Sequence, residues 1–319
     1  MNRWPKSIHS QVEAVFHSIR SFRESKDESS NGIRSFGSWR VYRTEAHQFA
    51  TFLEKHGTKS LMCTDEVTEG MRVYLETKLV QFTENQRSRQ TFETALSGLG
   101  KLEYGINQFN FHHNLSNPRL DTHQLRMEFY ERSKKALSRS SRDFISRAYP
   151  APIALINAIT DPTHQLQAAL QYEGGLRCEG AGAPANGLNN PINADCLQGY
   201  SADPVTGQKV GVLAVKEKGG KITEHYLSVE TYDRLKALID RKKSLASSYS
   251  AYLESVNQAA RQTGQYAEGR GTHGLKHNFA QERYLECIKH GMTHEQALQQ
   301  TSLETAHFRL RETLTYTRG

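Results

Sequence analysis

Apolar residues recur at three- and four-residue steps along most of the chain, which is the spacing of an amphipathic helix. In the first third this repeat predicts four helices, and Ser, Thr or Asp at their starts can cap them. The predicted segments are residues 8–22, a helix capped by Ser38 and ending at Gly57, one beginning at Thr64 or Asp65, and one running from Ser88 to 106. Residues 24–37 and 107–120 read as coil, and 121–148 as a helix followed by a basic linker.

A second pattern begins at Pro150. Short helices are predicted around residues 153–159 and over 165–172, the latter stopping at Gly174-Gly175, and residues 180–200 read as a loop. Two apolar runs, 210–215 and 222–227, flank Gly219-Gly220 and predict a β-hairpin, because glycine supplies the positive φ of a tight turn. The rest is predicted to be helical over 231–245, 249–262 and 273–316, with breaks near Gly291 and Ala306.

These elements predict a mainly α protein with a small β-sheet or hairpin. A chain of 319 residues is long enough for about two domains. We expect a helical N-terminal domain over 1–138, a linker over 139–149 and a second domain of α+β character over 150–319. The stretch 121–148 holds seven Lys or Arg against four acidic residues, which fits a linker that meets a polyanion and equally a solvated charged helix.

Composition narrows the class of protein. Charged residues make up 24% and hydrophobic residues 37%, a balance typical of a globular chain rather than a disordered one. No apolar run approaches the roughly 20 residues that span a bilayer, and the N-terminus lacks the apolar core of a secretory signal. The four cysteines have no paired spacing, as in reduced thiols. We therefore expect a cytoplasmic protein without membrane contact.

The net charge of +7 and the pI of about 9.1 favour a polyanionic partner, since phosphate neutralisation by Lys and Arg drives such binding. Basic residues at predicted helix starts, in the linker and beside the hairpin are candidate DNA contacts, although each is also compatible with ordinary solvated surface. They are Arg40, Arg43, Arg87, Arg89, Arg139, Arg142, Lys216 and Lys221.

Four short stretches carry the candidate chemistry. They are GGLRCE at 174–179, VKEKGGK at 215–221, THGLKHNFA at 272–280 and AHFRLRETLTY at 306–316. Taken singly each has an ordinary explanation. Arg177 fits a cation at a helix C-terminus, Lys218 a solvated turn lysine, His277 a core histidine and Tyr316 a surface residue.

Metal and nucleotide sites are the alternatives to exclude. His273 and His277 are spaced as a metal pair, but the H-E-x-x-H signature needs Glu at the position of Gly274. Cys287, His290 and His294 form a looser zinc candidate. The glycines at 180, 182 and 187 match no phosphate-binding loop. We expect neither a metal nor a cofactor.

Together, in order and spacing, the four stretches resemble the tyrosine recombinase (phage integrase) family. Its pattern runs T-G-L-R-x-x-E, a lysine in a G-K-G-x-K hairpin, H-x-L-R-H, then G-H and a tyrosine nine residues later. The matching residues are Arg177, Lys218, His273, Lys276, His307 and Tyr316. The match covers 150–316, and the helical N-terminal part is similar in layout to the family's core-binding domain.

The resemblance implies that Tyr316 attacks a DNA phosphodiester to give a 3′-phosphotyrosyl link and a free 5′-hydroxyl. Arg177 would bind the non-bridging oxygens with its planar fork. Lys218 would protonate the leaving 5′-oxygen, and His273 would assist proton transfer at Tyr316. His307 would hydrogen-bond a non-bridging oxygen. Nine residues place His307 and Tyr316 on opposite faces of one straight helix, so a break near 306–309 and a short helix carrying Tyr316 are expected.

Three positions depart from the family's pattern. Lys276 stands where the family has its second arginine, so it keeps the charge and loses the fork. A slower enzyme is expected, which Lys276→Arg should accelerate. Ala306 replaces the glycine before the histidine. Only three residues follow Tyr316, so the C-terminal helix that many relatives dock on a neighbour is expected to be absent.

The predicted function is therefore site-specific DNA recombination, as integration or excision of a mobile element. The implied partners are double-stranded recombination sites, bound by a homotetramer that exchanges strands through a Holliday junction. Two other classes fit the same residues. One is a catalytically weakened or inactive DNA-binding relative, and the other is an enzyme resembling type IB topoisomerases.

Overall fold

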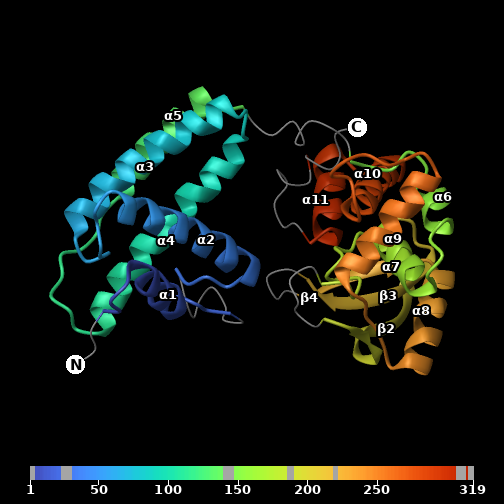
Figure 1. Cartoon of the computed structure of the whole chain (residues 1–319). Coiled ribbons are helices and arrows are strands. Elements are labelled where there is room, and N and C mark those ends of the chain that lie inside the picture. The colour runs from blue at the N-terminus through green and yellow to red at the C-terminus, as the bar shows by residue number, and fades with distance from the viewer. Residues whose placement is uncertain are drawn as a thin grey trace. The chain divides into compact units, whose positions relative to one another are not determined.

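The computed structural model describes residues 4–22, 31–138, 147–184, 190–217 and 222–306, together with Leu314. The chain divides into two compact units, Met1–Asp143 and Phe144–Gly319. The boundary falls within the stretch where the sequence places its linker. Figure 1 shows helices alone in the described part of the first unit, and helices around a small sheet in the second.

The first unit is built from helices that begin close to the predicted positions. They are α1 (Ile8–Ser18), α2 (Phe36–Lys55), α3 (Thr64–Glu84), α4 (Arg89–His112) and α5 (His123–Ala136). Ser88 caps α4 as predicted, since its side chain accepts the amide of Thr91. The cap of α2 is Ser35 and not Ser38, whose amide the Ser35 hydroxyl accepts. This helix therefore starts one turn earlier than the apolar stripe indicates.

Helix α4 also continues to His112, through residues that the sequence assigns to coil. Its asparagines explain the difference. Asn107 accepts the amide of Leu120 at 3.0 Å and donates to the carbonyl of the same residue at 2.8 Å. Polar side chains that usually favour loops here stay helical and satisfy the backbone of the segment that follows.

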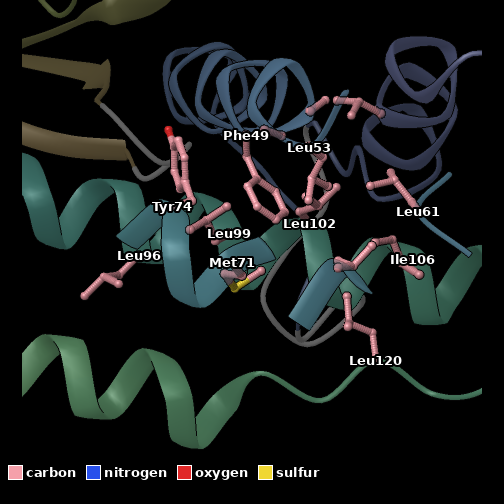
Figure 2. Close-up of a cluster of buried hydrophobic side chains, with 14 of the residues drawn as sticks. Phe49, Leu53, Leu61, Met71, Tyr74, Leu96, Leu99, Leu102, Ile106 and Leu120 are labelled. Carbon is pink, nitrogen blue, oxygen red and sulfur yellow. The ribbon is translucent and has the colours of Figure 1, made fainter. Parts of the chain in front are cut away.

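One apolar core holds the first unit together. Helix α1 packs on α2 and α4, and α5 packs on α3 and α4. In Figure 2, Phe49 and Leu53 of α2 meet Met71 of α3 and Leu99 and Leu102 of α4. All five side chains are fully buried. The aromatic and aliphatic stripes seen in the sequence are thus core.

The second unit combines helices with short antiparallel strands. Its elements are α6 (Pro152–Asn157), α7 (Pro162–Gly174), β1 (Ile192–Asn193), the 3₁₀ turn η2 (Ala194–Cys196), β2 (Leu197–Ala202), β3 (Lys209–Lys216), β4 (Ile222–Leu227), α8 (Val229–Lys242), β5 (Ser244–Leu245), α9 (Tyr249–Gln262), α10 (His273–Lys289) and α11 (His294–Glu304). Strands β2, β3 and β4 form an antiparallel sheet in that order, and β1 pairs with β5.

The predicted hairpin is confirmed as β3 and β4, which pair from Lys216 with Ile222 to Gly211 with Leu227. The sequence missed β2, because its side chains are mostly exposed and show little apolar alternation. Helix α8 packs on β3 and α7 on β4, and α10 lies beside α11 and against α7 (Figure 1). The fold class is therefore as predicted, mainly α with a small antiparallel sheet.

The predicted helix breaks near Gly291 and Ala306 are also present. Gly291 has a φ of +86° after α10, and Ala306 has a φ of +54° after α11. Left-handed backbone is favourable for glycine and costly for alanine. The surrounding structure therefore keeps Ala306 in a conformation that alanine alone would rarely adopt. None of the described helices has the length and apolar character that crossing a bilayer requires.

Candidate active site

The site is organised around the turn Gly174–Arg177, which ends α7. Gly175 adopts a φ of +65° and terminates the helix in the left-handed region. A Cβ at this position would run into the ring of Phe279 on α10. Glycine is thus required twice here, for the backbone conformation and for the close approach of α10. The turn places Arg177 directly after the buried Leu176.

Four consecutive residues of this turn each give one backbone group to a buried side chain. The pairs are the carbonyl of Gly174 with His225 of β4, that of Gly175 with Lys276 of α10, that of Leu176 with Gln171 of α7, and the amide of Arg177 with Glu217 at the end of β3. Buried backbone polar groups need such partners. Because the partners come from four elements, the position of Arg177 depends on the whole domain.

Glu217 binds Arg177 through both of its carboxylate oxygens. Oε1 accepts the backbone amide at 3.1 Å, and Oε2 accepts Nη1 of the guanidinium at 3.1 Å. The Glu217 side chain is 1% exposed and that of Arg177 is 19% exposed. Burial by itself would raise the pKa of Glu217, but the positive charges of Lys276 and Arg177 and the hydrogen bond from the Arg177 amide lower it. The carboxylate is therefore ionised at neutral pH and holds the arginine by a charge-assisted bond.

His225 lies behind this carboxylate, on the inward face of β4. Its Nδ1 lies 2.6 Å from the carbonyl oxygen of Gly174, and its Nε2 lies 3.9 Å from Oε1 of Glu217. Burial lowers the pKa of His225 to about 4. The ring is thus neutral at pH 7, and Nδ1 must carry the proton because its partner is a carbonyl.

Lys276 is fully buried on α10. Its Nζ donates to the carbonyl oxygen of Gly175 at 2.5 Å and to that of Thr305 at 2.8 Å. Burial lowers the pKa of Lys276 to about 7, against the opposing effect of the Glu217 charge. The residue matched to the family's second arginine therefore joins the Arg177 turn to the end of α11.

His273 begins α10 one turn before Lys276. Burial lowers its pKa to about 3, and the nearby charges of His277, Lys276, Arg147 and Arg177 act in the same direction. Its imidazole is neutral at pH 7 and can accept a proton, but a pKa this low makes it a weaker base than an ordinary histidine. Lys276 lies one turn after His273 on α10, and its amine bonds the carbonyl of Gly175, two residues before Arg177. The three predicted residues therefore lie in one region of the second unit.

The start of α10 is fixed by the segment that enters the second unit. The side chain of Asn278 accepts the amide of Tyr149 and donates to its carbonyl, each at 2.8 Å. The hydroxyl of Tyr149 donates to the carbonyl of Gly271 at 2.9 Å. A Cβ on Gly274 would lie 2.7 Å from the Tyr149 ring and 2.8 Å from the carbonyl of Arg147. Gly274, which excluded the zincin motif, has a packing role.

A buried ion-pair cluster joins the second half of α10 to the end of α11. Arg283 donates to Glu304 at 2.7 and 2.8 Å and to Asp203, after β2, at 2.9 and 3.2 Å. All three side chains are 7% exposed or less. These bonds raise the pKa of Arg283 although burial would lower it. The cluster fixes the end of α11, two residues before Ala306.

Several predicted site residues lie outside the described part of the chain. They are Lys218, His307 and Tyr316 among the catalytic candidates, and Arg139, Arg142 and Lys221 among the DNA contacts. The expected short helix bearing Tyr316 lies outside it too. Their roles remain predictions from the sequence.

The other predicted DNA contacts fall into two groups. Arg40, Arg87 and Lys216 are exposed. Arg43 instead pairs with Glu13 at 2.7 Å, and Arg89 pairs with Glu93 at 3.0 Å. These two guanidinium groups already have a carboxylate partner, which a phosphate would have to replace.

Among the described residues, no three His, Cys, Asp or Glu side chains are arranged to hold a metal ion. That covers the Cys287, His290 and His294 candidate. Cys287 is fully buried, and burial raises the pKa of its thiol to about 11.

Sequence reasoning missed Glu217 and His225. The sequence did hold a signal for Glu217. The family pattern R-x-x-E has a carboxylate three residues after the arginine, and this chain has Gly180 at that position. The missing carboxylate indicates that an acid from another segment could take its place. His225 carried no signal beyond its place in an alternating strand. Their contacts with the turn that ends α7 are seen only in the folded chain.

Comparison with solved structures identifies the fold. The site-specific recombinase XerH, bound to its difH substrate in a pre-cleavage complex, matches with a TM-score of 0.57 and 17% identity over 97% of this chain and 80% of that one. A lambda integrase fragment (75–356), seen as a dimer on a COC′ core site, matches with a TM-score of 0.56 and 11% identity over 98% and 95%. No model of a known family and no curated sequence matches the chain.

The chain thus has the fold of the tyrosine recombinases. XerH in a post-cleavage complex on a palindromic difH substrate extends the likeness, with a TM-score of 0.54 and 14% identity over 99% of this chain. At these identities the likeness concerns the fold alone. What the site does has to be argued from its residues.

Proposed function

We propose that the chain is a site-specific DNA recombinase that cleaves and rejoins strands through a 3′-phosphotyrosine at Tyr316. The observation that carries the proposal is the gathering of Arg177, His273 and Lys276, from motifs about 100 residues apart, around one immobilised turn in a recombinase fold. The structural relatives that were solved with DNA substrates or core sites support duplex DNA as the partner.

The reaction needs positive charge at the phosphate, a group that takes the proton from the attacking tyrosine, and a group that gives a proton to the leaving 5′-oxygen. Arg177 is suited to the non-bridging oxygens, because a carboxylate fixes its guanidinium while the side chain still reaches solvent. The Tyr316 oxygen attacks phosphorus, its proton passes to neutral His273, and the 5′-oxygen leaves with a proton from Lys218. Reversal of the same steps rejoins the strand, so no nucleotide cofactor is consumed.

Lys276 has an indirect part in this proposal. Its amine donates to two backbone carbonyls in a fully buried position. It therefore supports the Arg177 turn and adds positive charge behind it, and it does not contact the phosphate.

The broader assignments follow from the same function. We infer that two copies of the chain bind each recombination site and that a homotetramer exchanges strands through a Holliday junction. The reaction is integration or excision of a mobile element. The protein acts in the cytoplasm on nucleoid DNA, in keeping with its basic charge.

Covalent capture tests the proposal and reveals the DNA site in the same experiment. Cells expressing the tagged chain are lysed in denaturant, protein-linked DNA is recovered, and its ends are sequenced. Wild-type protein should yield a recurrent DNA sequence joined through its 3′-phosphate, and Tyr316→Phe should yield none. Nicked suicide duplexes made from that sequence should then trap the adduct in vitro.

The rival functions give different results in the same assays. A non-catalytic relative would retard DNA in a gel and trap no adduct. A type IB topoisomerase would relax any supercoiled plasmid as a monomer, whereas a recombinase needs paired cognate sites. Absence of a Tyr316-dependent adduct in cells and on duplexes would reject the proposed function.

A further inference from the structure

Glu217 connects the end of β3 to the turn that carries Arg177. We propose that Glu217 is the positioning residue that orients the Arg177 guanidinium for DNA cleavage, and that it supplies from β3 the carboxylate that Gly180 lacks. The assignment rests on the proposed function of the site. It goes further by giving a role to a residue outside the recombinase pattern.

The contacts suit this role. One carboxylate oxygen holds the backbone of Arg177 and the other holds its Nη1, both at 3.1 Å. Backbone and side chain are thereby fixed together, which removes rotamers that a free arginine would sample. The bond uses one of five guanidinium N–H donors, so an arginine held this way keeps donors for a phosphate.

The space around Gly180 shows why the acid comes from β3. A Cβ built on Gly180 would lie 2.6 Å from Oε1 and 3.2 Å from Cδ of Glu217. The carboxylate of Glu217 thus occupies the place that a side chain at position 180 would enter. The backbone of Gly180 does not have the positive φ that favours glycine. Another residue can therefore stand at position 180 once the Glu217 side chain is shortened.

Groups on the other elements hold Glu217 in the ionised form. Lys276 of α10 and Arg177 carry positive charge nearby, and His225 of β4 faces Oε1 at 3.9 Å. Glu179 is an acid two residues after Arg177 and is partly exposed. Glu179 is the matched control, because it carries the same charge and lies close to the same turn in sequence.

The test compares single-turnover adduct formation on the suicide duplex at saturating DNA. Glu217→Gln, nearly isosteric, and Glu217→Ala should both cleave about ten- to a hundredfold more slowly, the cost of one charge-assisted hydrogen bond. DNA affinity should change by less than about threefold for both, since one arginine is misoriented and not removed. Glu179→Gln should cleave at the wild-type rate.

Relocating the carboxylate separates positioning from simple support of the fold. An aspartate at position 180 can place its oxygen close to the site of Oε1. The double variant Gly180→Asp with Glu217→Ala should therefore cleave at least about tenfold faster than Glu217→Ala alone. Thermal melting of every variant monitors folding.

Each outcome decides the proposal. Wild-type cleavage by Glu217→Gln, or an equal loss in Glu179→Gln, would overturn it. So would a double variant that regains the melting temperature of the wild type but cleaves no faster than Glu217→Ala. If wild-type protein itself forms no Tyr316 adduct, the proposed function fails first and the role of Glu217 falls with it.

Discussion

The amine of Lys276 donates a 2.5 Å hydrogen bond to the carbonyl oxygen of Gly175, the left-handed residue that ends α7. The same amine reaches the carbonyl of Thr305 at the end of α11. One buried side chain thus ties the turn before Arg177 to the segment that leads towards His307.

Lys276→Arg should cleave more slowly than wild type by about tenfold or more and should melt at a lower temperature. The position is fully buried and its amine already lies at hydrogen-bonding distance from two carbonyls. A guanidinium is larger, and overpacking a core typically costs about 1–3 kcal/mol. The turn bearing Arg177 would shift as a result. The sequence alone leads to the opposite expectation, so a faster variant would restore the view that the lysine is a handicap.

Arg283→Met should lower the free energy of unfolding by about 3–5 kcal/mol, because it leaves the buried carboxylates of Asp203 and Glu304 without their cation. Urea unfolding followed by circular dichroism measures the change. Arg261→Met is the control, since its pair with Glu254 is about half exposed or more on both sides and should contribute less than about 1 kcal/mol. Equal decreases in unfolding free energy for the two variants would show that burial does not strengthen the contribution of the cluster to stability.

Stability should fall with acid through His225. The unfolded chain binds a proton at this residue near pH 6.5, whereas the folded chain does so only near its pKa of about 4. Between those values, each unit by which the pH falls lowers the free energy of unfolding by about 1.4 kcal/mol through this one group. His225→Asn removes this one contribution and should reduce the slope of unfolding free energy against pH by about 1.4 kcal/mol per unit between pH 6.5 and 4.5. His273 and His277, whose pKa values burial also lowers, keep their own contributions.

The control for that experiment is His290→Asn, at an exposed position after α10. It should leave the pH slope of the wild type in place. A His225→Asn slope as steep as that of the wild type would mean that other groups cause the acid sensitivity.

Gly175→Ala should destabilise the second unit and slow cleavage. The left-handed backbone costs an alanine about 1–2 kcal/mol, and the added methyl group also meets the Phe279 ring. Gly264→Ala is a matched control, since Gly264 has a φ of +68° and nothing within 4 Å of a Cβ. The excess loss of Gly175→Ala over Gly264→Ala measures the ring contact. A cleavage rate unchanged from wild type would show that the turn does not govern Arg177.

Salt dependence should separate the candidate DNA contacts of the first unit. If exposed Arg40 and Arg87 each neutralise a phosphate, replacing either with Ala should reduce the slope of log affinity against log salt by about one. Arg43→Ala and Arg89→Ala should reduce it less, because Glu13 and Glu93 already neutralise those side chains. Gel-shift titrations at several salt concentrations give the slopes, and four equal values would contradict the distinction.

The sequence by itself determined the helices, the β3–β4 hairpin and the break at Ala306. These depend on local properties, namely the spacing of apolar residues, capping side chains and the conformational freedom of glycine. Order and spacing of the motifs also named Arg177, His273 and Lys276 as candidate site residues, and the structure places these three in one region of the second unit. Lys218, His307 and Tyr316 remain predictions from the same motifs.

Only the tertiary structure decided what holds Arg177. Its turn depends on side chains of β4, α10 and α7 and on Glu217, which follows β3. Sequence spacing does not encode which of these segments meet. The same holds for Arg283, whose carboxylate partners lie 80 and 21 residues away. Lys276 shows the limit most clearly. Its charge could be read from the sequence, but its hydrogen-bond partners are backbone carbonyls, which every residue carries and which only folding selects.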